Sequence, residues 1–171
     1  MTPPKLSNSS PRSTPRIACY GTAFLADVQV DVTTFKRGIA LDSPQFSSPG
    51  LDASFLANCG SFLNGKTAIM DDPRSYFKRI AGTDFRLPKS TVFYECSTEL
   101  CGLLADLTEE RASEIAMKWH DINGPAKANR GSPNGRAQRR LAILNDLAAL
   151  ARQGKLGQTK LILRVEYRKQ L

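Results

Sequence analysis

The sequence predicts a single α+β domain, in which a small, mainly antiparallel or mixed sheet packs against a layer of helices. Segments with the two-residue alternation of strands and segments with the 3.6-residue period of helices both occur, and they do not alternate regularly along the chain. A length of 171 residues suits one domain with a tail. The composition, 41% hydrophobic and 23% charged, is typical of a soluble globular protein.

The first sixteen residues differ from the rest of the chain. They are rich in proline, serine and threonine, contain no acidic residue and have almost no apolar side chains. We therefore expect residues 1–16 to be a disordered tail and residues 17–171 to form the folded domain. The segment lacks the apolar core of a secretory signal, so we expect a cytoplasmic protein, although import into an organelle or secretion outside the Sec route stays open.

The first half of the domain predicts one strand and two short helices. Valines at 28, 30 and 32 alternate with polar residues, which indicates a strand over 23–32. Residues 38–50, rich in glycine, proline and serine, are expected to form a loop. Apolar residues at helical spacing predict a helix over 51–63. The pair Asp72-Pro73, an N-cap residue followed by proline at the first helical position, predicts a helix over 73–81 that Gly82 ends.

The second half predicts two clearer strands and three helices. The strands are expected over 91–96 and 160–168, and the helices over 98–107, 109–122 and 136–153. The helix over 109–122 has an apolar stripe that includes Trp119, which should therefore face the core, with Glu114 and Lys118 placed for an i,i+4 ion pair on the opposite side. Gly154 is expected to follow the end of the last helix.

Basic residues are concentrated before and within the start of the predicted helix over 136–153. The chain has 24 basic and 16 acidic residues, a net charge of +8, yet no acid lies between Asp121 and Asp146. The basic residues of this stretch are Lys127, Arg130, Arg136, Arg139 and Arg140. The first two fall in a connection over about 123–135 that should be mobile, because it is rich in glycine, asparagine and proline.

Three of these arginines are expected in the first turn of the helix, where positive charge is unfavourable. The helix dipole makes a cation there cost about 0.3–1 kcal/mol, whereas an anion gains as much. The amides of residues 131–135 together with Arg136, Arg139 and Arg140 are therefore a candidate anion site. The segment lacks the order of a Walker A loop. The alternative is that the arginines pair with Glu109, Glu110 or Glu114 on the preceding helix.

Other candidate sites have simpler structural explanations. His120 could activate one of the four cysteines, but its place on the predicted helix favours a surface histidine. Glu95 and Glu166 could form a carboxylate pair, although ion pairs with arginines on the same face are the simpler account. The strand aromatics Phe93, Tyr94 and Tyr167 are expected in the core and not on a nucleic-acid surface. The cysteine spacing gives no zinc pattern, so we expect reduced thiols and no metal or cofactor.

Three functions remain open, and no family resemblance separates them. The first is a small intracellular binding or regulatory domain that acts through contacts with a protein partner. The second is binding of nucleic acid or another polyanion through the basic segment 127–140. The third is an enzyme acting on a phosphorylated small substrate, with the arginines as a clamp and a pocket beside them. No apolar run is long enough to span a membrane, so no membrane partner is expected.

Overall fold

The computed structural model describes residues 16–28, 43–66, 75–82, 89–122 and 133–170. Residues 1–15 of the predicted tail and most of the 123–135 connection lie outside these residues. The elements follow one another as β1 (Arg16–Asp27), β2 (Gln45–Pro49), α1 (Ala53–Leu63), β3 (Phe77–Gly82), β4 (Lys89–Cys96), α2 (Thr98–Ala105), α3 (Glu109–Ile122), α4 (Pro133–Gly157) and β5 (Thr159–Gln170).

The five strands form one antiparallel sheet in the order β2-β1-β5-β4-β3. The last strand of the chain is therefore the central strand of the sheet. β5 pairs with β1 along its whole length, from Arg16 opposite Gln170 to Asp27 opposite Thr159. Because the two strands come from opposite ends of the chain, the sheet cannot form until nearly all of the domain has been brought together.

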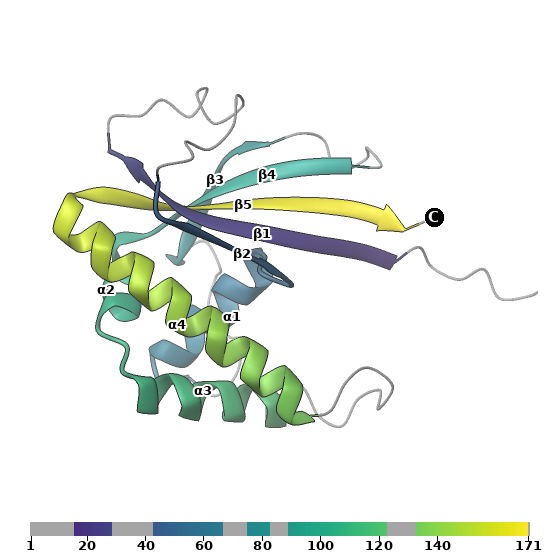
Figure 1. Ribbon diagram of the computed structural model, residues 1–171, viewed down its shortest axis with the longest axis vertical. Helices are drawn as coiled ribbons and strands as arrows, with labels where there is room; N and C mark the ends of the chain where they lie inside the picture. The colour runs from purple at the N-terminus through teal and green to yellow at the C-terminus, as the bar shows by residue number, and fades with distance from the viewer. Residues whose placement is uncertain (1–15, 29–42, 67–74, 83–88, 123–132, 171) are drawn as a thin grey trace, which may run out of the picture.

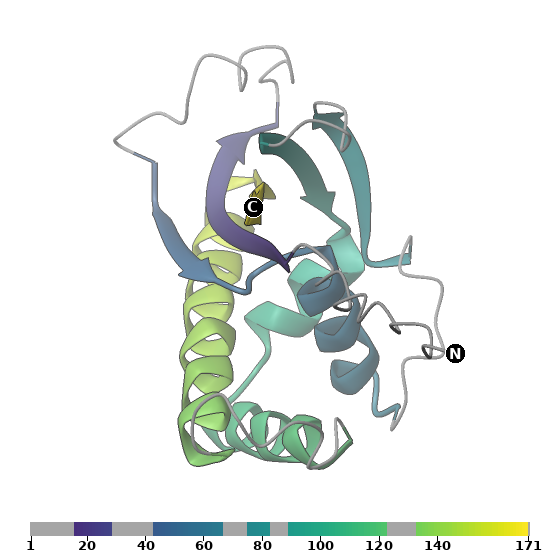
Figure 2. The ribbon, with the colours of Figure 1, turned by 90° about the vertical axis from the view of Figure 1, so that its right-hand side faces the viewer.

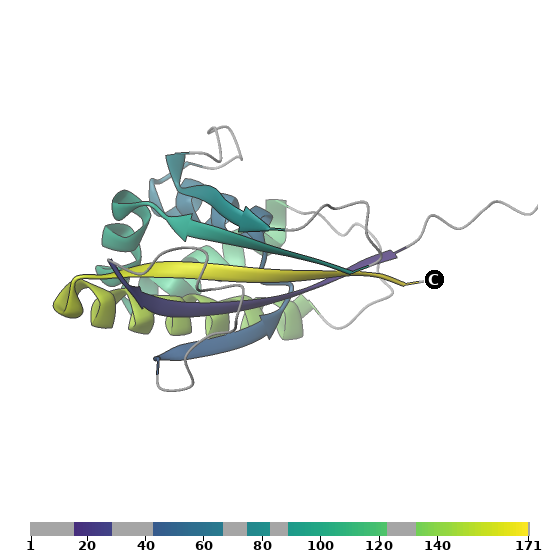
Figure 3. The same ribbon diagram turned by 90° about the horizontal axis from the view of Figure 1, so that it is seen from above.

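The helices form a second layer on one face of the sheet (Figure 1). Turning the molecule by 90° shows the sheet curving over this layer, with α4 running along one side of it (Figure 2). From above, the strands cover the helices and follow the order given by their pairing (Figure 3). This two-layer arrangement confirms the predicted α+β class.

The main core lies between the two layers and contains side chains from all four helices and from the inner face of the sheet. Trp119 is buried there, with its ring centroid 4.7 Å from that of Phe55 and 5.4 Å from that of Phe62. The prediction that Trp119 faces the core is confirmed. A smaller cluster on the other face of the sheet consists of Phe24, Ala26, Phe93 and Ile162, with Ile80 and Ala81 packed against it.

Several predicted elements are confirmed with their end signals. α3 has the predicted bounds, and the Thr108 hydroxyl accepts a hydrogen bond of 3.2 Å from the amide of Arg111. α1 and α2 begin with capping side chains, Asp52 and Ser97, which accept from the amides three residues later. The strands predicted over 91–96 and 160–168 lie within β4 and β5.

Three predictions for the first half of the chain are wrong. The strand predicted over 23–32 has the wrong bounds, because β1 starts at Arg16 and ends at Asp27, before Val28; Val30 and Val32 lie outside the described residues. The loop predicted over 38–50 contains the edge strand β2. Residues 77–81 of the helix predicted over 73–81 lie in β3, because pairing with β4 outweighs the local helix signal of Asp72 and Pro73, which lie outside the described residues.

The last helix is also longer than predicted at both ends. It begins at Pro133, three residues before Arg136, and continues to Gly157. Gly154 is therefore a buried residue inside the helix and not the residue that follows it.

Candidate anion-binding site

The three arginines of the candidate site lie on α4, but only Arg136 lies near its first turn. Pro133 occupies the first position of the helix, which proline favours because its missing amide hydrogen would have no partner there. Arg136 is thus the fourth residue of the helix, and Arg139 and Arg140 belong to its second turn. Since the dipole effect falls off within the first turn, the prediction that all three arginines lie there is wrong for Arg139 and Arg140.

A different observation singles out Arg136 and Arg140. They are four residues apart and so share one side of α4, which packs beside α3. The guanidinium carbon of Arg140 lies 5.4 Å from the centroid of the Trp119 ring, within the range of a cation–π contact. Trp119 thereby holds Arg140 against the helical layer.

Both guanidinium groups contain a nitrogen that is enclosed and unsatisfied. Arg136 Nε and Arg140 Nη1 are buried and find no hydrogen-bond partner in the described part of the chain. Burial lowers the pKa of Arg140, and the neighbouring positive charge of Arg136 lowers it further. Enclosed cationic donors of this kind are costly unless an acceptor reaches them. The pair therefore has unused capacity to bind an anion.

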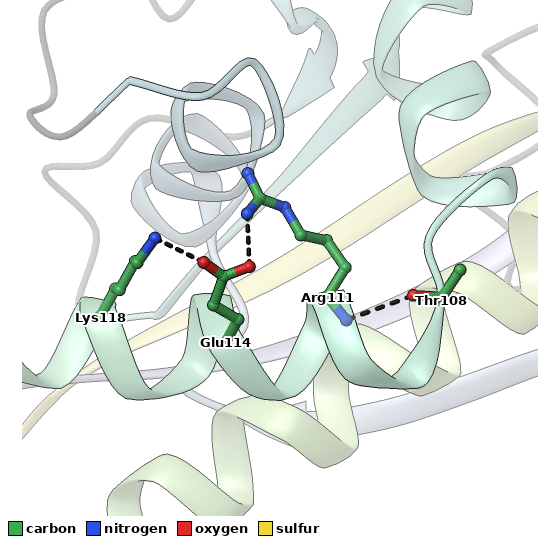
Figure 4. Close-up of polar contacts among 4 residues, drawn as sticks. All are labelled: Thr108, Arg111, Glu114 and Lys118. Atoms are coloured by element: carbon green, nitrogen blue, oxygen red, sulfur yellow. Dashed lines mark hydrogen bonds and ion pairs between the residues drawn. The ribbon is translucent and has the colours of Figure 1, made fainter.

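The glutamates of α3 do not supply that anion in the part of the chain that the structure describes. Glu114 is occupied within its own helix, by Arg111 at 2.5 Å and by Lys118 at 2.6 Å (Figure 4). The Lys118 contact confirms the predicted i,i+4 pair. The pKa of Glu110 is lowered by its own backbone amide and by the Thr108 side chain.

Of the three arginines, only Arg139 donates a hydrogen bond within the described chain, from Nε to the carbonyl of Gly135 at 3.4 Å. No described carboxylate forms an ion pair with any of the three. The alternative that they pair with Glu109, Glu110 or Glu114 is therefore not what the structure shows.

Two predicted members of the basic cluster cannot be placed. Lys127 and Arg130 lie outside the described residues, as do residues 131 and 132 of the predicted amide site, and the side chain of His120 is not described either. The structure therefore brings together Arg136, Arg139 and Arg140 and leaves the other candidates as predictions.

The pKa values of the cysteines are shifted in the direction opposite to that of a catalytic nucleophile. All four are free, and burial raises the pKa of each, in the case of Cys59 to about 12. A reactive cysteine needs a lowered pKa so that the thiolate forms near neutral pH. Nothing in these environments supports the Cys–His hypothesis.

The carboxylate pair is replaced by ion pairs, as the simpler account predicted. Glu95 lies opposite Ile162 in the sheet, whereas Glu166 lies opposite Thr91, four residues away along β4. Each carboxylate has its own two partners. Glu95 contacts Lys78 and Lys160, both at 3.4 Å, while Glu166 contacts Arg164 at 2.5 Å and Arg168 at 3.5 Å.

The strand aromatics Phe93 and Tyr94 are buried, on opposite faces of the sheet, and Tyr167 packs half-buried against the main core. They do not form a stacking surface for bases, which confirms their expected place in the core. Tyr20 on β1, which the sequence did not single out, is the aromatic side chain with the most exposure among the described residues, at 48%.

A cavity of about 450 Å³ lies at the opposite end of α4, where the helix returns to the sheet. It was not predicted from the sequence, and its only sequence signal is a glycine inside each of two helices, Gly102 and Gly154. Eleven residues of helix separate Arg140 from Ala151 in its wall, a distance of about 16 Å along the axis. The arginines therefore do not line it.

The described residues include no group of three or more histidine, cysteine or acidic side chains arranged to hold a metal ion. Among the same residues, no helix has the length and apolar character needed to span a membrane. The chain matches no protein-family model, and comparisons with curated proteins and with solved structures found no match.

Proposed function

We propose that the protein is a small binding domain that recognises an acidic segment of a protein partner through Arg136, Arg139 and Arg140. The observation that supports this function is a buried guanidinium nitrogen without an acceptor in each of Arg136 and Arg140, beside a cation–π contact of Arg140 with Trp119 and with no ion pair to a described carboxylate. Arginine suits this role because its planar fork binds carboxylates with two parallel hydrogen bonds.

The size of the patch favours a protein partner over duplex nucleic acid. Residues 136 to 140 rise only about 6 Å along α4. A duplex carries one charge about every 1.7 Å of its axis, and strong binders contact several phosphates along it. A few carboxylates on one turn of a partner match three arginines better than a long phosphate backbone does.

The third function, an enzyme on a phosphorylated substrate, gains no support from the geometry. It requires a pocket beside the arginines, and the cavity described above lies at the other end of α4. We place the protein in a reducing, cytosol-like compartment, where its four free thiols remain reduced.

Binding to a fluorescein-labelled peptide of eight glutamates, followed by fluorescence anisotropy in 50 mM NaCl, tests the proposal. Changing Arg136, Arg139 and Arg140 together to alanine should weaken binding at least tenfold, because charge-assisted hydrogen bonds are worth about 1.5–3 kcal/mol each. The matched control changes Lys78, Lys155 and Arg168 to alanine, which removes the same charge from side chains that are 66–67% exposed. Its loss should stay below threefold.

Two results would contradict the proposal. Equal losses in the two triple variants would mean that the peptide senses overall charge and not a site. Tighter binding to a 20-base-pair duplex, with log K falling by about 0.9 per phosphate contact for each tenfold increase in salt, would replace it with nucleic-acid binding.

A further inference from the structure

The cavity at the C-terminal end of α4 is lined by parts of five elements and opens to solvent. Its wall includes Leu25 from β1, Cys96 from β4, Gly102 from α2, Ala151 from α4 and Leu161 from β5. A volume of about 450 Å³ lies in the lower part of the range of pockets that hold small molecules, about 300–1,000 Å³. The space therefore suits a small ligand and not a peptide segment.

The inner wall is apolar. Leu25, Ala151 and Leu161 are buried, as is Cys96. Burial raises the pKa of Cys96 well above its ordinary value and also raises that of Cys101, so both sulfur groups stay protonated and uncharged at neutral pH. This part of the wall offers dispersion contacts to an apolar ligand body.

α2 carries a glycine, Gly102, where it borders the cavity. A Cβ atom built on Gly102 would meet no heavy atom within 4 Å. Gly154, on the opposite wall, is different, because a Cβ there would lie 3.1 Å from Leu25 Cδ2 and 3.3 Å from Thr159 Oγ1. The glycine at 154 thus allows close packing, whereas the glycine at 102 leaves room.

The polar groups of the wall carry a net positive charge. Lys155 and Lys160 line the cavity together with a single carboxylate, Glu95. That carboxylate already has two ammonium partners, Lys160 and Lys78. Lys155 contacts only the exposed Asp106, at 3.4 Å, a type of pair that contributes about 1 kcal/mol or less and is readily exchanged.

One polar atom of the wall has no partner. Thr159 Oγ1 is buried and forms no hydrogen bond within the described chain. A buried hydroxyl in this state is destabilising unless a ligand or a water molecule reaches it. An unsatisfied hydroxyl, an apolar wall and surplus ammonium charge together describe the complement of an amphipathic anion.

We propose that this cavity binds a small amphipathic acid, with its apolar chain against Leu25, Ala151 and Leu161 and its carboxylate toward Lys155 and Thr159. Decanoate is a suitable probe, and decanol is the matched probe without charge. The site is separate from the arginines of α4, so this inference does not depend on the function proposed above.

Amide chemical shifts of ¹⁵N-labelled protein locate the binding. Decanoate at concentrations below micelle formation should shift the amides of Gly102, Gly154 and Thr159 in a saturable manner. Shifts confined to residues 136–140 would place the acid at the arginines and overturn the inference, as would the absence of saturable shifts.

Two sets of variants test the proposed contacts. Gly102→Leu should abolish binding of both probes by filling the cavity, and leucine is a better helix former than glycine, so the variant should fold. Ser113→Leu is the matched control, because Ser113 is exposed on α3 and does not line the cavity. The double variant Lys155→Ala/Lys160→Ala should weaken decanoate at least fivefold and decanol less than twofold. Unchanged binding of decanoate to Gly102→Leu, verified as folded by circular dichroism, would overturn the inference.

Discussion

Both ends of α4 carry arginines, but these arginines differ in the hydrogen-bond acceptors that surround them. Near the C-terminal end, Arg152 donates from Nε to the carbonyl of Ala105 at 3.0 Å and from Nη2 to the carbonyl of Leu107. Near the N-terminal end, Arg136 Nε and Arg140 Nη1 are buried and have no partner among the residues that the structure describes. Figure 1 shows why, since the C-terminal half of α4 lies beside the turn between α2 and α3, while the other half extends past it along α3.

The difference shows that the available acceptors, and not the residue type, decide what an arginine does. The last carbonyls of a helix have no partner in their own helix, so the end of α2 offers acceptors that Arg152 satisfies. Beside Arg140 lies the indole ring of Trp119. The ring attracts the positive charge of the guanidinium but offers no oxygen that could accept a hydrogen bond from it. Arg152 therefore stabilises the fold, whereas binding by the arginines at 136, 139 and 140 is the proposal made above.

The largest expected effect follows from removing Arg152. Arg152→Met should lower the free energy of unfolding by about 2–4 kcal/mol, because two carbonyls lose charge-assisted hydrogen bonds. Urea denaturation at pH 7 measures it. Arg168→Met is the control, since this arginine is exposed and its pair with Glu166 should contribute less than about 1 kcal/mol. Equal losses in the two variants would remove the distinction between the two ends of α4.

Alkaline pH should destabilise the protein through groups at the cavity end of α4. The folded state holds the Cys96 thiol protonated, because its pKa is raised, whereas in the unfolded chain the thiol ionises near pH 9. The unfolded state then binds fewer protons, so stability is constant below pH 8 and falls as the pH rises above 9. Each such thiol should contribute a loss of about 1.4 kcal/mol between pH 8 and pH 10.

Urea denaturation at pH 8 and pH 10 measures this loss. Cys96→Ala should reduce the difference between the two pH values by about 1.4 kcal/mol, while Arg140→Met should leave it unchanged. An identical pH dependence in wild type and Cys96→Ala would show that this thiol is not kept protonated by the fold.

A smaller effect, of opposite sign, is expected at the cavity. Gly102→Leu should raise the free energy of unfolding by up to about 1 kcal/mol, because glycine is a poor helix former and the added side chain enters open space. Thermal unfolding compares this variant with Gly154→Leu, whose side chain would collide with Leu25 and Thr159 and should destabilise the protein. Destabilisation of both variants would mean that the space beside Gly102 is not available.

Local signals in the sequence predicted the second half of the fold well and the first half poorly. α3 combines a capping threonine, an apolar stripe and an i,i+4 ion pair that all indicate the same helix. β1 lacks such agreement, because Ala23 to Ala26 are all buried and the sheet covers apolar residues on both faces. In a strand that is buried on both faces, apolar and polar residues do not alternate. The prediction therefore relied on the alternating valines that follow Asp27 in the sequence.

The edge strands depend on tertiary pairing. β2 has only five residues, with two serines and a proline at its end, a composition typical of a loop and tolerated at a sheet edge. β3 follows a sequence with a clear helix-start signal. Both strands form because β1 and β4 offer them hydrogen-bonding partners, which a single sequence does not reveal.

The charge pattern of the sequence singled out the candidate site, but the position of the arginines relative to the helix start was predicted incorrectly. The absence of acids near the arginines is visible in the sequence, whereas the stacking of Arg140 on Trp119 depends on how α3 and α4 pack. The cavity could not be predicted, because it combines residues from five elements.

The smallest expected effect tests most directly whether Arg136 contributes to the stability of the fold. Arg136→Met keeps the length of the side chain and removes a charge that lowers the pKa of Arg140 and has no acceptor of its own. The free energy of unfolding should therefore stay the same or rise by up to about 0.5 kcal/mol, the range of changes away from specific contacts. Urea denaturation at low and high salt measures it, and any gain should shrink at high salt because like-charge repulsion is screened. A loss of more than 1 kcal/mol would mean that Arg136 has a structural partner, and the contrast between the two ends of α4 would then have to be given up.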